Sequence, residues 1–134
     1  MTVFIDSNIP MYVAGRAHPH REPARRFLET VRAGEVEGVT STEVLQEILY
    51  RYAALRRLDL AGSVYELFVQ ICPVVLPVTL ADTDRARDLL PTLRGASARD
   101  AIHAAVMLNN GIREIATFDK GFDHLAAIER VRLA

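Results

Sequence analysis

Cysteine is nearly absent from this chain of 134 residues, because Cys72 is the only one. A single cysteine cannot form a disulfide within the chain, and it excludes a zinc site built from several cysteines. Cys72 lies in an apolar segment directly before Pro73. We therefore interpret it as an unreactive thiol in the hydrophobic core.

Lysine is equally scarce, since Lys120 is the only one among the sixteen lysine and arginine side chains. The formal net charge is −1, so no bulk positive charge indicates a polyanionic partner. Arginine donates in a forked geometry that suits phosphate oxygens, and the composition therefore still permits a local RNA contact. The candidates for such contacts are Arg16, Arg51, Arg94 and Arg99, with solvated surface arginines as the alternative.

Long apolar runs are missing as well. No run approaches the roughly 20 residues of a membrane-spanning helix, and no basic segment precedes an apolar one as in a signal peptide. The sequence therefore predicts a cytoplasmic protein without a membrane partner. Half of the residues are apolar, and a chain of this length suits one globular domain over residues 1–134 with a substantial core.

Apolar, β-branched runs alternate with segments of helical periodicity along the whole chain. The runs predict strands at Thr2–Ile5, Val36–Thr40, Val74–Val78, Glu114–Thr117 and, at an edge, Arg130–Leu133. The periodic segments predict helices at Ile9–Ala14, Arg21–Ala33, Thr42–Leu55, Asp59–Cys72, Thr79–Leu93, Ala98–Asn109 and Lys120–Ala127. This order predicts an α/β fold, a three-layer α/β/α sandwich with a mostly parallel central sheet of about five strands.

The apolar stripes of the helices indicate which faces enter the core. We expect Leu49, Leu67 and Leu80 to face inward on three successive helices. Pro91 ends or kinks the third of them. The run Val74–Val78 is nearly all apolar, which is typical of a parallel strand covered on both faces.

Asp6, Ser7 and Asn8 follow the first strand directly. Such residues commonly cap a helix N-terminus. The carboxyl end of a central strand is also where open α/β sheets bind their ligands. On this stretch alone, Asp6 is therefore either a helix cap or a ligand-binding carboxylate.

Three further acids occupy comparable places. Asp119 follows the strand that ends at Thr117, so it shares a sheet edge with Asp6. Glu47 lies two turns into the helix after the second strand, and Asp100 lies near the start of an alanine-rich helix. If Asp100 faces inward it needs a nearby cation, because an unpaired buried carboxylate costs several kcal/mol.

Four acids in one place require a positive charge, because clustered carboxylates repel and raise one another's pKa. An all-oxygen site suits a hard divalent ion such as Mg²⁺ or Mn²⁺. A metal held in this way binds phosphate oxygens and activates a water molecule. The pattern therefore points to phosphodiester hydrolysis.

Two other acids are possible alternatives. Glu43 shares a helix face with Glu47 and could replace it, although the spacing from Ser41 favours Glu47. Asp123 lies four residues after Asp119, and we interpret it as a solvated or helix-capping residue.

The histidines are a weaker signal for a hard metal, which prefers oxygen ligands. His103 lies three residues after Asp100 on the same helix, and we interpret it as a structural histidine with satisfied hydrogen bonds. His18 and His20 lie in a loop and are expected to be solvent-exposed rather than a metal-binding pair.

Four segments occur in a characteristic order: Phe-Ile-Asp-Ser-Asn, Thr-Ser-Thr-Glu-Val-Leu-Gln-Glu, Arg-Asp-Ala-Ile-His-Ala-Ala and Ala-Thr-Phe-Asp-Lys-Gly-Phe. Together they resemble the PIN domain, and within it the VapC-type toxins of bacterial and archaeal toxin–antitoxin pairs, over essentially the whole chain. The resemblance implies a Mg²⁺- or Mn²⁺-dependent endoribonuclease that acts on single-stranded or loop RNA. It also implies a small inhibitory antitoxin and a homodimer.

The family's four metal-site acids fall, in order, on Asp6, Glu47, Asp100 and Asp119. In such sites the fourth acid acts directly or through water. Asn8 and Thr117 match polar positions that orient the first and fourth acids. Part of the apolar stripe that contains Val64, Leu67, Phe68 and Ile71 is either core or a surface for a dimer or an antitoxin.

Two other functions stay open. One is a non-toxin or non-catalytic PIN-type module that binds RNA or protein, but such a module has no use for a repulsive cluster of acids. The other is an unrelated α/β phosphatase with Asp6 as its nucleophile. That mechanism usually needs a second aspartate two residues later, where this chain has Asn8.

Overall fold

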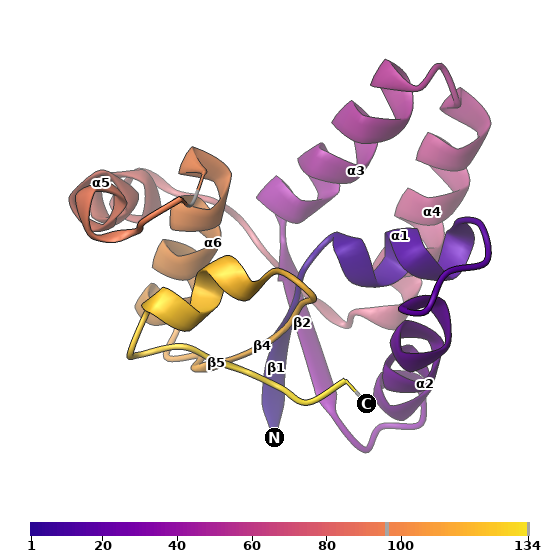
Figure 1. Ribbon diagram of the computed structural model, residues 1–134, viewed down its shortest axis with the longest axis horizontal. Coiled ribbons are helices and arrows are strands. Elements are labelled where there is room, and N and C mark those ends of the chain that lie inside the picture. Colours follow the sequence, from indigo (N-terminus) through magenta and orange to yellow (C-terminus); the bar gives the residue numbers. More distant parts are fainter. Residues whose placement is uncertain (96, 134) are drawn as a thin grey trace.

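A parallel sheet forms the centre of the molecule in the computed structural model (Figure 1). Within the described residues, 1–95 and 97–133, five strands pair in the order β3-β2-β1-β4-β5, and every pair is parallel. The strands are β1 (Thr2–Ile5), β2 (Glu37–Ser41), β3 (Val74–Leu76), β4 (Glu114–Ala116) and β5 (Glu129–Arg130). The predicted mostly parallel sheet is confirmed.

Helices cover both faces of the sheet. They are α1 (Asn8–Ala14), α2 (Arg21–Arg32), α3 (Thr42–Ala54), α4 (Leu58–Ile71), α5 (Leu80–Leu89) and α6 (Ala98–Asn109), with 3₁₀ turns η1 (Leu90–Thr92) and η2 (Lys120–His124). Figure 1 places α1, α2 and α4 on one side of the strands and α5, α6 and η2 on the other. This arrangement confirms the three-layer α/β/α fold. No helix of the described residues is both long enough and apolar enough to span a bilayer.

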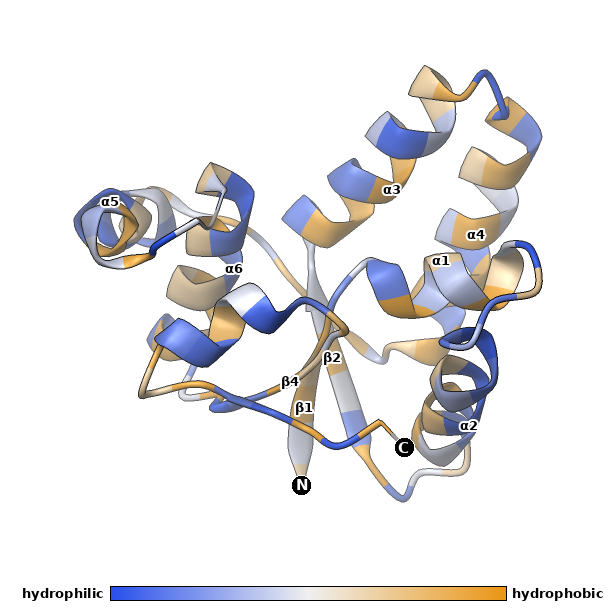
Figure 2. Ribbon diagram, viewed as in Figure 1, coloured by the Kyte–Doolittle hydropathy of each residue, from blue (hydrophilic) through white to orange (hydrophobic). Residues whose placement is uncertain are grey.

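The core lies around the central strand β1. Val3, Phe4 and Ile5 have no exposed surface, as expected for a strand covered on both faces. Figure 2 shows hydrophobic and hydrophilic residues sharing each of the longer helices, which is the pattern of helices that cover one face of a sheet. Cys72 is also buried, and burial raises the pKa of its thiol to about 12, so it is the unreactive core cysteine expected from the sequence.

Gly38 lets β2 approach α2 closely. A Cβ atom at this position would lie 2.6 Å from Cγ1 of Val31, closer than side chains tolerate, and 3.0 Å from Cδ1 of Ile5, which is a tight contact. A glycine inside a strand often marks such a close approach. Gly38 therefore sets the distance between the sheet and the helix layer that contains α2.

Three helix ends have local causes, and one of them, the break at Pro91, was predicted. The Ser41 hydroxyl accepts a hydrogen bond from the Val44 N–H at 3.4 Å and caps α3. Pro91 lies in η1, where α5 gives way to a 3₁₀ turn. Gly111 has a φ of +69°, the left-handed conformation that ends α6 and that glycine adopts without strain.

Several apolar residues are more exposed than their patterns predicted. Leu67 is 58% exposed and Leu80 is 76% exposed, and Leu49 also faces solvent. β3 is an edge strand with Val74 exposed, so the expectation of a strand covered on both faces is wrong. A periodic pattern locates an apolar stripe, but it does not say whether another element packs against it.

The chain after β4 is less regular than predicted. The segment expected as a helix over Lys120–Ala127 is the short 3₁₀ helix η2. The last strand spans Glu129–Arg130 rather than Arg130–Leu133, although its place at the sheet edge is confirmed.

Candidate metal-binding active site

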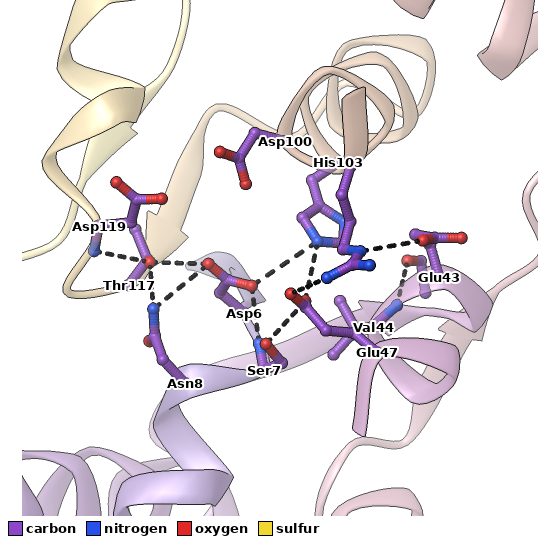
Figure 3. A network of polar contacts seen from close by, with 12 residues as sticks. Asp6, Ser7, Asn8, Glu43, Val44, Glu47, Asp100, His103, Thr117 and Asp119 are labelled. Atoms are coloured by element: carbon purple, nitrogen blue, oxygen red, sulfur yellow. Dashed lines mark hydrogen bonds and ion pairs between the residues drawn. The ribbon is translucent and has the colours of Figure 1, made fainter. Parts of the chain in front are cut away.

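The carboxyl ends of β1 and β4 lie side by side at the centre of the sheet. Ile5 pairs with Ala116 in register, and the N–H of Asp6 donates to the Ala116 carbonyl at 3.1 Å. Asp6 and Thr117 are consequently neighbours at the edge where parallel sheets collect functional side chains. Figure 3 shows the polar side chains gathered there.

Asp6 accepts hydrogen bonds on both carboxylate oxygens. Oδ1 accepts from the N–H of Ser7 at 2.7 Å, and Oδ2 accepts from the hydroxyl of Thr117 at 2.8 Å. Burial has the largest influence and raises the pKa of Asp6, although His103 and the Thr117 hydroxyl act in the opposite direction. The side chain makes no cap for α1, whose N-cap position belongs to Ser7. Of the two interpretations of Asp6, the helix cap is therefore wrong.

The Thr117 hydroxyl joins Asp6 to the turn that carries Asp119. It accepts from the Asn8 amide at 2.9 Å and from the N–H of Asp119 at 3.1 Å. The Asn8 amide also lies 3.5 Å from Oδ2 of Asp6. The Asp119 carboxylate in turn accepts from the N–H of Gly121 at 2.8 Å. Asn8 and Thr117 thus both contact the first acid, and Thr117 also contacts the backbone of the fourth.

Glu47 reaches the same place from α3. Its Oε1 accepts from the Ser7 hydroxyl at 2.7 Å, and its Oε2 accepts from Arg99 at 3.1 Å. His103 Nε2 lies 3.5 Å from Oε1. Burial opposes ionisation of Glu47, but His103, Ser7 and Arg99 together outweigh burial and lower the pKa of Glu47 to about 2. Glu47 is therefore a carboxylate at neutral pH.

His103 lies on α6 and is completely buried between two acids. Its Nε2 is 3.7 Å from Asp6 and 3.5 Å from Glu47, and among the described residues neither ring nitrogen has a hydrogen-bonding partner of good geometry. Burial lowers the pKa of His103, but the two carboxylates outweigh burial and raise the pKa above its ordinary value. The expectation of satisfied hydrogen bonds is therefore wrong, and the structural role of His103 stays a prediction.

Asp100 lies in the first turn of α6 and takes part in its N-terminal cap. The Ser97 hydroxyl accepts from the N–H of Asp100 at 3.1 Å, and the Asp100 carboxylate accepts from the N–H of Ser97 at 3.4 Å. Burial, and then the charges of Asp119 and Asp6, raise the pKa of Asp100. The partner of this half-buried carboxylate is a backbone N–H, and not the cation that the sequence suggested.

The four predicted acids meet at one edge of the sheet, and the alternatives do not. Glu43 contacts Arg99 at 3.7 Å, so Glu47 is the acid of α3 that reaches Asp6. Asp123 is exposed and pairs with an arginine of β5 at 2.8 Å. Arg99, a predicted RNA contact, is instead paired with both glutamates of α3.

Sequence reasoning missed two serines at the site. Ser97 and Asp100 have the spacing of a capping box, and that local signal could have been recognised. Ser7 contacts Glu47 across 40 positions of the chain. No local pattern predicts that contact.

The donor set fits a hard divalent cation. In Figure 3 the carboxylates of Asp6, Asp100 and Asp119 surround a common space, and the charges of the other two raise the pKa of Asp100. On the opposite side of Asp6, Glu47 and His103 lie with it in a group whose ligand atoms are within 4.8 Å of one another. There the His103 imidazole lies between the two carboxylates, and a hard ion prefers oxygen to nitrogen, so the oxygen donors on the other side suit such a metal better.

The fold and the site together define an α/β protein with a metal-fitting cluster of acids at the carboxyl edge of a parallel sheet. The family model for the PIN domain matches residues 3–128. Ribonuclease VapC13 of Mycobacterium tuberculosis is 41% identical over 129 residues, which cover 96% of this chain and 98% of the relative. The chain belongs to the PIN domain family, among the VapC ribonucleases.

Solved structures share the fold at lower identity. VapC20 of Mycobacterium tuberculosis, described as a sarcin-ricin loop cleaving toxin, matches with a TM-score of 0.77 and 22% identity over 92% of this chain and 95% of that one. A toxin–antitoxin complex from Klebsiella pneumoniae matches with a TM-score of 0.70 and 16% identity over 98% of both chains. The resemblance to this family that the four sequence segments indicated is confirmed.

Proposed function

We propose that this chain is a Mg²⁺- or Mn²⁺-dependent endoribonuclease that hydrolyses RNA phosphodiester bonds. The observation that carries the proposal is the way Asp6 is held. Its two oxygens accept from Ser7 and Thr117, while acids from α3, α6 and the β4 end surround it. Repulsion among these carboxylates is tolerated where a divalent cation balances it.

The acids have different roles in this proposal. Asp6 and Asp100 would hold the ion, with Asp119 bound directly or through water, and Asn8 and Thr117 would orient the first and fourth acids. The bound ion would neutralise phosphate charge and supply an activated water. Glu47 has a pKa of about 2, so it is a poor proton acceptor at neutral pH and contributes fixed negative charge instead.

The partners follow from the family and the surface. We propose single-stranded or loop RNA as the substrate, in the cytoplasm, and a small antitoxin as the inhibitor. Support for the antitoxin comes from the similar Klebsiella pneumoniae chain, which is part of a toxin–antitoxin complex.

The exposed apolar residues Leu67 and Leu80 are suited to a protein contact, and a homodimer is the commonest assembly of such a chain. We also propose that residues 1–134 form one nuclease domain.

Purified chain free of any partner tests the function. We expect it to cut single-stranded RNA with Mg²⁺ or Mn²⁺ and to be inactive with EDTA. Asp6→Asn and Asp100→Asn should each lower the cleavage rate by an order of magnitude or more, because they remove a charged metal ligand. Asp123→Asn is the matched control, since it removes an exposed aspartate that pairs with Arg130.

Two results would count against the proposal. Equal cleavage rates for Asp6→Asn, Asp100→Asn and Asp123→Asn would show that cleavage does not use the proposed metal site. RNA binding without any cleavage in the presence of either ion would support the alternative, a non-catalytic PIN-type binding module.

A further inference from the structure

A hollow of about 470 Å³ opens directly beside the acids, between α1, the loop after it and α3. Its wall begins with Ser7 and Asn8, the residues that contact Glu47 and Asp6. The volume is within the range of pockets that bind small molecules. Anything bound in this hollow therefore lies next to the proposed metal site.

Four aromatic rings form a continuous cluster, in which Tyr12 and His18 line this hollow and His20 and Phe118 pack against them. His20 stacks on Phe118 with ring centroids 4.0 Å apart and an interplanar angle of 9°. Tyr12 meets both rings edge-on, at 5.1 and 5.3 Å, and His18 lies 4.7 Å from Tyr12. His18 is exposed and His20 is half-buried, so the predicted exposure of both loop histidines is wrong for His20. Because Phe118 directly precedes Asp119, the cluster is fixed to the acidic site.

Two arginines line the same hollow. Arg16 and Arg51 are exposed, and within residues 1–95 and 97–133 neither forms an ion pair with an acid. Arg99, by contrast, is paired with Glu47 at 3.1 Å. A larger hollow of about 630 Å³ near β5 contains Arg130, which is likewise paired with an acid at 2.8 Å. The hollow beside Tyr12 thus combines rings with arginines that can take a phosphate.

We propose that this hollow binds one nucleotide of single-stranded RNA beside the scissile phosphate, with the base on Tyr12 and His18 and the phosphate on Arg16 and Arg51. The proposal rests on the proposed ribonuclease function and specifies part of its substrate. Aromatic rings stack on any base, and the arginine fork matches phosphate oxygens. A base held in a duplex is unavailable for such stacking, which selects unpaired RNA.

Binding of a labelled single-stranded RNA tests the proposal without cleavage. The protein is the full chain with Asp100→Asn, which silences the reaction, and binding is followed by fluorescence anisotropy. Adding His18→Ala should raise the Kd roughly 5- to 100-fold, the usual effect of losing a stacked base. Adding Arg51→Ala should also raise the Kd and reduce the slope of log K against log salt by about 0.7, because one phosphate contact is lost.

The control is Arg113→Ala, which removes an exposed arginine directly before β4, at the opposite edge of the sheet. It should leave the Kd unchanged. RNA that contains 2-aminopurine gives a second readout, since the fluorescence of this base falls when it stacks and the chain has no tryptophan to interfere. Quenching should be smaller with His18→Ala than with the control.

The outcomes separate this proposal from the ribonuclease function. If the wild type cuts RNA but both hollow variants bind and quench like Arg113→Ala, the nucleotide site is wrong and the nuclease stands. If the wild type cuts nothing but the variants still weaken binding and quenching, the nuclease is wrong and the nucleotide site stands. If the variants bind RNA normally but escape inhibition by an antitoxin, the hollow docks protein and the proposal is overturned.

Discussion

The hydroxyl of Ser7 donates a 2.7 Å hydrogen bond to Oε1 of Glu47, which joins the end of β1 to α3. Ser7 occupies the N-cap position of α1, where a serine hydroxyl normally accepts from a helix N–H. Here it makes no such cap bond. The Ser7 hydroxyl therefore holds Glu47 beside Asp6 instead of capping α1. This use of the hydroxyl indicates that Ser7 has a role in the site.

Ser7→Ala should lower the RNA cleavage rate by roughly tenfold, because a hydrogen bond to a charged group contributes about 1.5–3 kcal/mol. Loss of that bond also raises the pKa of Glu47, which the Ser7 hydroxyl helps to keep low. The measurement is the single-turnover cleavage rate at neutral pH. Ser7→Thr keeps the hydroxyl and should restore most of the rate. A Ser7→Ala protein that cuts RNA at the wild-type rate would contradict a role for Ser7 in the site.

Glu47 should make the protein less stable in acid. Its pKa is about 2 in the folded chain, against an ordinary value of 4.5. Because the folded-state pKa is the lower one, the stabilisation is complete above about pH 4.5 and is lost as the pH falls towards 2. Urea unfolding at several pH values between 5 and 3 should show a smaller loss of unfolding free energy for Glu47→Gln than for the wild type.

The control for Glu47→Gln is Glu66→Gln, which changes an exposed glutamate on α4. It should follow the wild-type dependence on pH. If the curves for Glu47→Gln and the wild type run parallel, Glu47 is not held in its charged form by its neighbours.

Gly38→Ala should destabilise the fold by about 1–3 kcal/mol, the usual cost of overpacking. The added methyl group would meet Val31 at 2.6 Å and Ile5 at 3.0 Å. Gly62→Ala, on α4 with nothing within 4 Å of the new atom, should instead stabilise by up to about 1 kcal/mol. Urea unfolding of both variants tests this contrast, and two variants of equal stability would contradict it.

The sheet and the acids at its edge were predictable because their signals are local. Thr2–Ile5 is a short β-branched and aromatic run, and Asp6 follows it directly. Asp119 has the same relation to the run that ends near Thr117. In a parallel sheet such residues share one edge, so their proximity follows from the topology alone.

Other features depend on contacts that no local pattern encodes. The stripe that contains Leu67 has helical spacing, but its exposure depends on which elements pack nearby. The pairing of Arg99 with Glu47 spans 52 positions, and the burial of His103 between two acids requires the finished fold. Charge and periodicity in the sequence identify the candidate residues, whereas tertiary packing determines which of them contact one another.

Metal-specificity switching at Asp100 is the most direct test of the proposed metal site. Asp100→Cys replaces a hard oxygen ligand by a thiolate, which prefers softer metals. We predict RNA cleavage at least tenfold below wild type with Mg²⁺, and substantial recovery with Cd²⁺. Asp123→Cys, the matched control, should cut at the wild-type rate with Mg²⁺ and gain nothing from Cd²⁺. Equal activity of Asp100→Cys with Mg²⁺ and with Cd²⁺ would contradict the role of Asp100 as a metal ligand.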